Sequence, residues 1–409
     1  MTNEKGLLYD WNSIYLSEVI DTIETGCRPK GGITNLKEGI PSIGGEHLNS
    51  YGKFDLKNIR LIPHKFFESM RTGKIRKYDI LLVKDGATTG KVSFIDDSFP
   101  FKKAAVNEHV FILRGKNKKI DQKYLYYNIF SPRGQNNIKK SFHGAAIGGI
   151  TRKFIDQYTL KLPPLETQKK IVSVLDKVEI LKDMRIKTNE STNDYLNSIF
   201  FEMFGNPIIN NKGWEELTLA KICIKITDGT HNSPPLVDSG IPYVTAKHIK
   251  PNHIDFYSNP TYISAPYHKK IYNRCNPKKG DVLYIKDGAT TGIAAINNFP
   301  FEFSMLSSLA LLRPDYNKIT SEYLCYWLNN PLVREKMTNS MSGAAIKRFT
   351  LIKIKQFKIL VPPISLQNKF TNIVREIEKI KEYQGRSKQQ IDSLFDCLLQ
   401  KAFQGELYC

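Results

Sequence analysis

Three kinds of pattern are missing from this sequence, and each absence excludes a class of protein. No stretch of about 18 or more apolar residues occurs, so we expect no membrane-spanning helix. The first residues, MTNEKGLLYDW, lack the apolar core of a secretory signal. No cysteine forms a C-x-x-C pair, which excludes zinc-finger and dithiol motifs and favours a reducing, cytoplasmic compartment. The six cysteines are Cys27, Cys223, Cys275, Cys325, Cys397 and Cys409.

The sequence also contains a glycine-rich segment that resembles a phosphate-binding loop but lacks parts of its motif. Such a loop needs four residues between its glycines and Ser or Thr after its lysine. The GATTGK segment at 86–91 has three residues between its glycines and is followed by Val92. A second copy of the segment has Ile293 where the lysine would be. We therefore interpret both copies as glycine-rich turns that follow a strand.

Other segments that resemble enzyme motifs are also incomplete. Residues 259–262 resemble the N-P-P-Y motif of amino-methyltransferases, but Thr261 takes the third position and no glycine-rich cofactor loop stands in the required order. Pro314 and Asp315 begin a nuclease pattern, yet no acidic-x-Lys element follows to complete a metal-binding carboxylate cluster. The eight histidines have no ligand spacing such as H-x-x-x-H. We expect neither a metal site nor a catalytic residue.

Size and charge point to a multidomain protein with a polyanionic partner. The chain has 409 residues, more than one ordinary domain holds, and its apolar content of 41% is enough for true hydrophobic cores. Lys and Arg number 60 against 40 Asp and Glu, a formal net charge of +20. An excess of this size indicates a polyanionic partner, and composition alone fits a nucleic acid and a membrane surface equally.

The sequence is a tandem duplication. KDGATTG at 84–90 recurs at 286–292, each time after an apolar, strand-like run. Further repeated pairs are GIP at 39–41 and 240–242, FPF at 99–101 and 299–301, GAAI at 144–147 and 343–346, and a double proline followed by Gln168 or Gln367. The offset stays between 199 and 203 throughout. A period of this length predicts two similar domains rather than a solenoid.

Each half combines a mixed segment with one long helix. The mixed segments contain short strand patterns broken by Gly, Pro, Asn and Asp, with helical stretches at 121–130 and 321–330. After the double prolines, apolar residues spaced by three and four predict helices at about 166–204 and 366–403. We predict an α+β fold whose two long helices pack antiparallel, each spanning roughly 55–60 Å at ~1.5 Å per residue.

The positive charge lies in the mixed segments and not in the helices. The predicted boundaries are 1–164 and 206–363 for the mixed domains, and 165–205 and 364–409 for the helices, with Gly205 and Gly405 as C-caps. Residues 1–165 carry a net charge of +11 and residues 205–363 a net charge of +9, whereas the helix charges cancel. The mixed domains are therefore the expected polyanion binders and the helices neutral spacers, which disfavours a basic membrane-binding helix.

In this duplicated order of motifs, the sequence resembles the specificity subunit of a type I restriction-modification enzyme. The motifs that carry the resemblance are the two D-[IV]-L-x-[IV]-K-D-G-A-T-T-G elements, the two P-P-x-x-x-Q junctions at 163–168 and 362–367, and the helix ends at 204–205 and 402–407. The resemblance covers essentially the whole chain. No single motif is diagnostic of the family, but their repeated order is.

The resemblance implies a fold, a function and partners. It implies two target-recognition domains on a pair of antiparallel helices with pseudo-twofold symmetry. Each domain would read half of a bipartite site in double-stranded DNA, and the helices would fix the spacing. It also implies two modification subunits that methylate adenine with S-adenosylmethionine, and restriction subunits that use ATP and Mg²⁺. These are separate chains, so this chain would hold no cofactor and perform no catalysis.

Candidate interface residues follow from the polar loops and from the helices. Residues 228–233 and their counterparts 24–29 occupy the same place with different side chains, which suits two readers of different sequences, although an ordinary polar turn fits equally well. The expected DNA-binding set is Arg28, Lys30, His47, Lys84, Lys140, His143, Arg152, Lys153, His231, Asn232, Lys247, His248, Lys286, Lys347 and Arg348. The apolar residues expected to dock other subunits are Ile171, Leu175, Ile199, Phe370, Ile377 and Leu398.

Two other interpretations stay open at this point. One is a DNA-modifying enzyme with a cryptic nuclease or methyltransferase site, which would show turnover by the pure chain with Mg²⁺ or S-adenosylmethionine. The other is a basic scaffold that binds RNA or DNA, which would give footprints without sequence preference.

Overall fold

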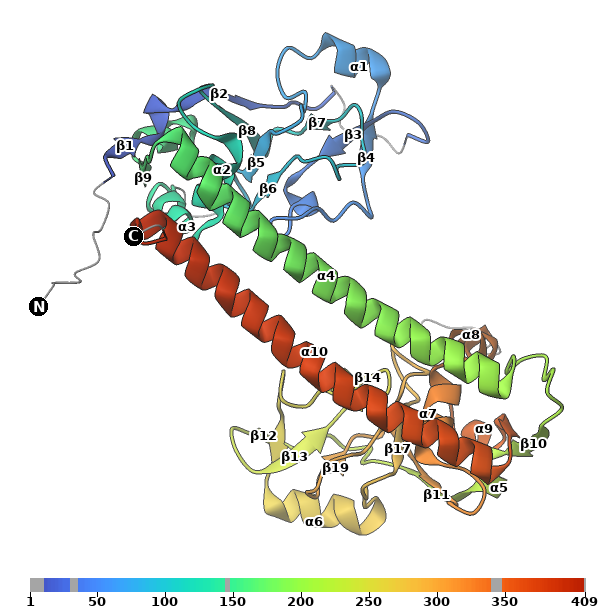
Figure 1. Cartoon of the computed structure of the whole chain (residues 1–409). Helices are drawn as coiled ribbons and strands as arrows, with labels where there is room; N and C mark the ends of the chain where they lie inside the picture. The colour runs from blue at the N-terminus through green and yellow to red at the C-terminus, as the bar shows by residue number, and fades with distance from the viewer. Residues whose placement is uncertain (1–10, 30–35, 144–147, 340–347, 408–409) are drawn as a thin grey trace, which may run out of the picture. The chain divides into compact units, whose positions relative to one another are not determined.

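A computed structural model of the chain describes residues 11–29, 36–143, 148–339 and 348–407 (Figure 1). The chain forms two compact units. The first contains the residues up to Ile186 and from Arg386 onward, and the second is Lys187–Gly385. Both units combine helices with small, mostly antiparallel sheets, which confirms the predicted α+β class.

A four-stranded antiparallel sheet with the strand order β2-β8-β5-β6 is the centre of the first unit. Its neighbours are the three-stranded sheet β4-β3-β7 and the pair β1-β9. The strands are β1 (Ser13–Tyr15), β2 (Ile20–Thr25), β3 (Ile40–Ile43), β4 (Arg60–Ile62), β5 (Ile80–Val83), β6 (Val92–Phe94), β7 (Ala105–Val106), β8 (Val110–Gly115) and β9 (Thr159–Lys161). The helices are α1 (His64–Ser69), α2 (Gln122–Phe130) and α3 (Pro132–Lys140), with 3-10 turns at Leu16–Glu18, Gly45–His47 and Arg152–Asp156.

Strand β5 shows why this sheet is buried on both faces. Successive side chains of a strand point to opposite faces. Leu82 therefore packs into the core that contains Tyr124 and Leu125 of α2. Leu81 and Val83 instead share a second core with residues of the neighbouring three-stranded sheet. A continuous apolar run such as ILLV is the pattern that a two-faced central strand requires.

The second unit repeats this plan. Its central sheet has the order β11-β20-β17-β18, beside a second sheet with the order β12-β16-β13-β19. The strands are β10 (Glu215–Thr218), β11 (Cys223–Asp228), β12 (Leu236–Val237), β13 (Ile241–Val244), β14 (Ile249–Lys250), β15 (His253–Ile254), β16 (Tyr262–Ile263), β17 (Val282–Ile285), β18 (Ala294–Ile296), β19 (Ser304–Met305), β20 (Leu309–Pro314) and β21 (Lys358–Val361). The helices are α5 (Leu219–Ile222), α6 (Ala265–Arg274), α7 (Ser321–Asn329), α8 (Pro331–Asn339) and α9 (Leu351–Lys355), with a 3-10 turn at Ala246–His248.

The two long helices of the prediction are present. They are α4 (Leu165–Phe204) and α10 (Ile364–Gln404). In the first unit, Leu175 of α4 and Leu399 of α10 belong to one core. In the second unit, the ring of Phe200 on α4 lies 5.6 Å from that of Phe370 on α10. Each unit thus joins the first half of one helix to the second half of the other, which is the pairing of antiparallel helices.

The P-P-x-x-x-Q junctions have a structural role that explains their repetition. The side chain of Gln168 is fully buried, and its Oε1 accepts a hydrogen bond from the backbone N–H of Asp121 at 2.7 Å. Its Nε2 donates to the carbonyl of Pro163 at 2.8 Å. In the second unit, Gln367 accepts from Thr320 at 2.9 Å in the same way. The glutamine therefore ties the start of each long helix to the start of α2 or α7.

Candidate functional site

The KDGATTG segments form tight connections after β5 and β17. Gly86 has a φ of 91° and the equivalent Gly288 has a φ of 102°, a left-handed conformation that favours glycine. The hydroxyl of Thr89 donates to the carbonyl of Gly86 at 2.7 Å and closes the turn. The repeated motif is therefore a constrained strand connection, as the sequence interpretation proposed.

Three loops meet at this turn. In the first unit, the N–H of Lys84 donates to the carbonyl of His109 at 2.9 Å, and the N–H of Ile150 donates to the carbonyl of Lys84 at 2.7 Å. The second unit has the equivalent pair of bonds, at 2.9 Å and 2.8 Å. The residues that form them are Lys286, Ser308 and Phe349. The two GAAI segments, which precede the third loop in each unit, lie outside the described residues.

Ionisable side chains of these loops, together with Arg28 from the segment after β2, form a continuous chain in the first unit. We call this set edge 1 and define it as Arg28, Lys84, Asp85, Glu108 and His109. Arg28 Nε lies 2.7 Å from Oε1 of Glu108, and the same oxygen is 3.4 Å from Nε2 of His109. His109 contacts Asp85, which also pairs with Lys84 at 3.1 Å. Burial acts to raise the pKa of Asp85, but hydrogen bonds from His109 and Lys84 lower it below its ordinary value.

The second unit has a different chain at the same place. We call this set edge 2 and define it as Asp228, Arg274, Lys286, Asp287 and Arg348. Lys286 lies 3.0 Å from Asp287 and 3.6 Å from Asp228. Arg274 pairs with Asp228 at 2.7 Å, and Arg348 lies 3.1 Å from Asp287. Edge 2 therefore has a lysine at its centre and an arginine at each end.

Most of the predicted DNA-binding residues lie at the surface. The exposed ones are Arg28, Lys140, His143, Arg152, Lys153, His231, Asn232, Lys247 and Arg348. Lys84 is half-buried in edge 1, while Lys286 is only 2% exposed. Lys30 and Lys347 fall outside the described residues. A buried ammonium cannot touch a phosphate, so Lys286 is corrected from a contact residue to an internal one.

The two predicted histidines are also corrected, because both are buried and hold 3-10 turns. His47 Nδ1 accepts from the N–H of Gly44 at 2.8 Å, and His248 Nδ1 accepts from the N–H of Thr245 at 2.9 Å. His248 Nε2 faces the carbonyl of Asn259 at 2.9 Å, so it carries the single proton of a neutral ring. Burial lowers the pKa of His248, which further favours the neutral form. These repeated histidines are structural.

The six apolar residues expected to dock other subunits are needed inside the units. Ile171, Leu175, Ile199, Phe370 and Ile377 are buried in the hydrophobic cores of the units, and Leu398 packs against one of them. Periodicity identified the buried stripe of each helix and not its outer face. The large apolar side chains that the long helices expose are Ile180, Leu181, Met184, Ile186, Tyr195, Phe201, Ile380, Tyr383 and Leu394.

The predicted DNA-binding set lacks six members of the edges: Asp85, Glu108, His109, Asp228, Arg274 and Asp287. Two of them show why residues were missed. His109 belongs to no motif, and Arg274 is the last residue of α6, in a region without a matching repeat. Each reaches its edge only because distant segments are packed together. No local signal in the sequence marks either residue.

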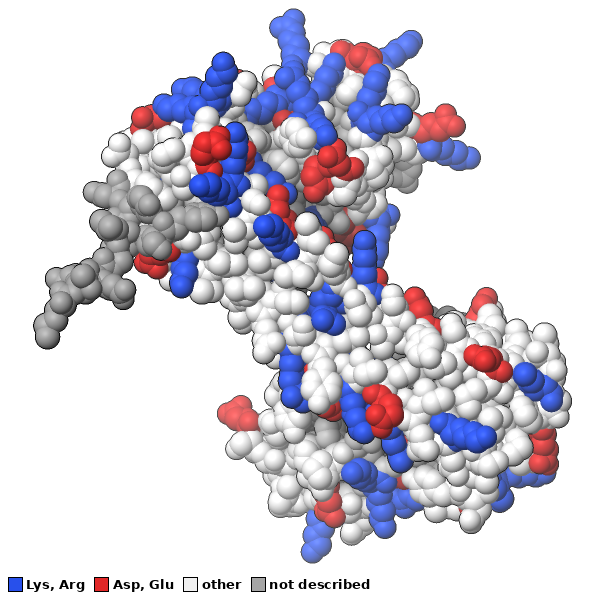
Figure 2. All heavy atoms as spheres, viewed as in Figure 1, with Lys and Arg blue, Asp and Glu red and all other residues white. Residues whose placement is uncertain are grey.

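Basic side chains gather on the sheet-bearing part of the first unit. Figure 2 shows Lys and Arg over the region of α1 in the first unit, with further basic groups around α6 in the second. This location matches the charge balance of the sequence, in which the mixed segments carry all of the excess. Phosphate groups are the ligands that such surfaces attract most strongly.

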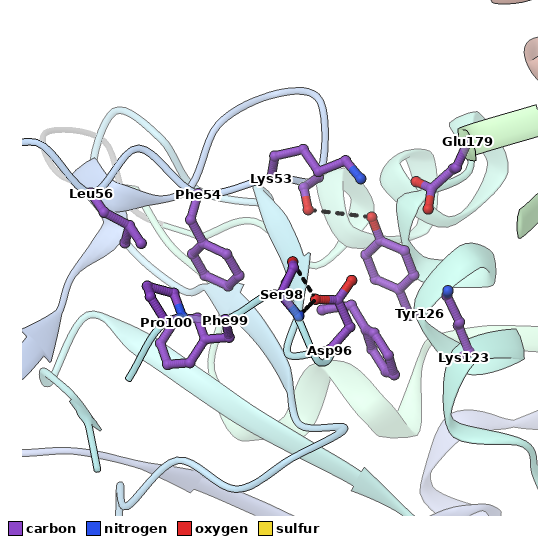
Figure 3. Close-up of a pocket in the computed structure, with 12 residues that line it drawn as sticks. Lys53, Phe54, Leu56, Asp96, Ser98, Phe99, Pro100, Lys123, Tyr126 and Glu179 are labelled. Atoms are coloured by element: carbon purple, nitrogen blue, oxygen red, sulfur yellow. Dashed lines mark hydrogen bonds between the residues drawn. The ribbon is translucent and has the colours of Figure 1, made fainter. Parts of the chain in front are cut away.

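A small pocket in the first unit lies where α2 and α4 meet the loop at residues 52–56 (Figure 3). Its volume is about 220 Å³, and its polar lining residues are Lys53, Asp96, Ser98, Lys123, Tyr126 and Glu179. Burial raises the pKa of Glu179, although Lys53 and Lys123 act to lower it. Residues of the loop at 52–56, of α2 and of α4 line the pocket together.

The described residues contain neither a metal site nor a membrane-spanning helix. Within the described residues, no three side chains of His, Cys, Asp or Glu are grouped to bind one metal ion. The described helices include none with the length and apolarity to cross a membrane.

The fold is that of a protein with two copies of an α+β domain, each followed by a long helix. Comparison with known proteins identifies the family. The model of the type I restriction modification DNA specificity domain matches residues 9–192 and 211–393. The chain therefore belongs to this family, and it is a type I specificity subunit with two DNA specificity domains.

Relatives of the chain are distant in sequence and match it over most of its length. The putative type I restriction enzyme MjaX specificity subunit of Methanocaldococcus jannaschii is 22% identical over 94% of this chain and 90% of its own length. The EcoBI specificity subunit of Escherichia coli is 22% identical over 74% of this chain and 69% of its own. A solved S subunit from M. genitalium has a TM-score of 0.54 at 17% identity and covers 98% of both chains.

Proposed function

We propose that each unit reads one half of a bipartite DNA site, with edge 1 and edge 2 facing the base pairs. The observation that carries this proposal is the pair of edges itself. The same three loops meet in both repeats, yet the charged side chains on them differ. Loops of fixed geometry with different side chains are suited to reading two different sequences. The exposed lysines of the mixed domains would supply most of the affinity through phosphate contacts.

The same proposal assigns the long helices to spacing and docking. Their lengths of 40 and 41 residues give rods of roughly 60 Å at ~1.5 Å per residue. The exposed apolar side chains of α4 and α10 are suited to bind two modification subunits, since exposed patches of this kind mark protein interfaces. They replace the buried residues that the sequence had suggested for this role.

Catalysis is assigned to other subunits. We place S-adenosylmethionine on the modification subunits, and ATP with Mg²⁺ on restriction subunits, so that this chain contributes recognition alone. A cytoplasmic location follows from chromosomal DNA as the substrate. What supports the assignment is the incomplete state of every catalytic motif in the sequence.

The decisive experiment maps methylated adenines in the genome that encodes the chain. We expect a bipartite motif, and exchange of residues 1–160 for those of another family member should change one half of it only. Insertion of helical residues near Thr188 should lengthen the gap and leave both halves unchanged. A change in both halves after the exchange, or an unchanged gap after the insertion, would contradict the proposal.

Two alternatives are distinguished by simpler assays of the pure chain. Methyl transfer or cleavage by the chain alone, with S-adenosylmethionine or Mg²⁺, would make it an enzyme with a cryptic site. Binding without sequence preference, even beside a modification subunit, would make it a basic nucleic-acid scaffold.

A further inference from the structure

Edge 2 is built so that one buried lysine holds two carboxylates. Lys286 is 2% exposed, and its Nζ faces Oδ2 of both Asp228 and Asp287. Carboxylates withdrawn from water are stable only when a partner compensates the lost hydration. The lysine gives this compensation from the inside of the unit. The Oδ1 atoms of the two carboxylates are left for partners on the outside.

Those outer partners are Arg274 and Arg348. Arg274 Nη2 donates to Asp228 Oδ1 at 2.7 Å, while Arg348 Nε makes an ionic contact of 3.1 Å with Asp287 Oδ1. Their side chains are 54% and 60% exposed. A guanidinium has five N–H donors, and one carboxylate cannot use all of them. Each arginine is therefore held beside a carboxylate on one side, with Nη2 of Arg274 also 3.4 Å from Nε2 of His231, and keeps further N–H donors for a ligand.

We propose that Arg274 and Arg348 determine the specificity of the second unit by recognising guanine bases in the major groove, and that Lys286 is the residue that positions them. This inference rests on the proposed function, because it assumes that edge 2 faces the bases. It goes further by naming the base and the side chains that select it.

Guanine is favoured over phosphate for two physical reasons. Guanine presents O6 and N7 as a pair of acceptors that match the fork of an arginine, and prior orientation of the fork reduces the freedom lost on binding. Phosphate is disfavoured because Asp228 and Asp287 stand beside the arginines and repel anions. A base pair tolerates those carboxylates, since cytosine N4 can donate to one of them.

The arrangement is specific to the second unit. The register of the sheets places Thr25 at the position of Asp228, since β2 pairs with β8 as β11 pairs with β20. The bridge that Asp287 makes with Arg348 is made by Asp85 with Gly149 in the first unit. Edge 1 therefore has Thr25 in place of Asp228 and Gly149 in place of Arg348, and the guanine requirement applies to one half-site only.

The test uses the full chain in complex with its modification subunits. Methylation mapping and domain exchange first define the half-site of the second unit, and each of its guanines is then replaced by 7-deazaguanine, which lacks N7. At least one replacement should weaken wild-type binding about tenfold, the lower part of the range for a bidentate arginine. The same replacement should leave binding by Arg274→Ala or Arg348→Ala unchanged, because that variant has already lost the contact.

Control variants separate base reading from other roles. Lys358→Ala removes a cation that is 66% exposed and pairs with Glu216 outside edge 2, so it should keep the full discrimination against 7-deazaguanine. Lys286→Met should reduce this discrimination while binding to non-specific DNA is kept, which a general structural defect would not produce. Because this variant could misfold, the two surface arginine variants carry the test.

Three outcomes would count against the inference in different ways. If no 7-deazaguanine weakens wild-type binding, the guanine assignment is overturned. If the arginine variants weaken binding equally on all sequences and lower the salt dependence by about one ion, the arginines contact phosphates. If the complex prefers no sequence at all, the proposed function itself fails.

Discussion

Edge 1 and edge 2 occupy the same place in the two repeats but have different centres. The centre of edge 1 is His109, which is 42% exposed, and the centre of edge 2 is Lys286, which is 2% exposed. The backbone hydrogen bonds that bring the loops together are the same in both units. The duplicated fold thus fixes where the loops meet, and the side chains are able to diverge because the loop geometry does not depend on them.

A second comparison concerns the ion pairs between each long helix and its unit. Lys123 on α2 pairs with Asp176 on α4 at 2.8 Å. The equivalent pair is Glu322 on α7 with Arg375 on α10, at 3.3 Å and with the charges exchanged. Each pair is favourable within its own unit. If α2 packed against α10, Lys123 would face Arg375, and if α7 packed against α4, Glu322 would face Asp176. Both arrangements place like charges together, so the exchanged charges help each unit to select its own helix.

The largest difference between the edges should appear when the lysines are removed. Lys286→Met leaves the buried Asp228 and the partly exposed Asp287 without their inner partner, although each keeps an arginine beside it, and we expect the second unit to lose about 3 kcal/mol of stability. Lys84→Met should cost the first unit under about 1 kcal/mol, because Lys84 is 25% exposed and water screens its pair with Asp85. Urea unfolding followed by hydrogen exchange in each unit measures both values.

A compensated variant serves as the control for this comparison. Replacing Lys286 by Met together with Asp228→Asn and Asp287→Asn removes the uncompensated charges, so most of the lost stability should return. Equal losses for Lys286→Met and Lys84→Met would show that the two edges are stabilised in the same way and would contradict the comparison.

The pH dependence of the two long helices should also differ. Burial raises the pKa of Glu179 on α4, whereas its counterpart Glu378 on α10 is exposed. A carboxyl with a raised pKa in the folded state contributes stability below its ordinary pKa and loses it as the pH rises through the folded value. Glu179→Gln should therefore raise the unfolding midpoint of the first unit at neutral pH, and the gain should disappear as the pH falls towards about 4.3.

The matched variant for this prediction is Glu378→Gln, which should give no such pH-dependent gain in the second unit. Thermal unfolding at several pH values is the measurement. A gain for Glu179→Gln that persists unchanged at acidic pH would mean that the effect comes from packing rather than from the ionised carboxylate.

The smallest effect is expected for the exchanged ion pairs. Lys123→Glu places an acid beside Asp176, and we expect a loss under about 1 kcal/mol, since both side chains remain partly exposed. The double variant Lys123→Glu with Asp176→Lys should recover much of this loss, although Asp176 also accepts a hydrogen bond from Tyr127. A double-mutant cycle measured by chemical unfolding gives the coupling. A coupling energy of zero would show that the ion pair does not contribute to the choice of helix.

The sequence predicted the fold much better than it predicted the interface. Repeats and periodicity gave the duplication, the α+β class and both long helices. They could not show which face of each helix remains outside, so Ile171 and Phe370 were expected at an interface although both are buried. His47 and His248 were chosen because they recur, but in this chain recurrence marked a turn that both units need.

What the sequence by itself determined is the set of features that depend on local order: strand and helix periodicity, glycine turns, helix ends and the distribution of charge between segments. What only the tertiary structure decided is which side chains stand together. Lys286 is next to Asp287 in the sequence, but Asp228 and Arg274 reach the same edge from far away. The physical reason is that burial and charge pairing depend on contacts between distant segments, which local periodicity does not indicate.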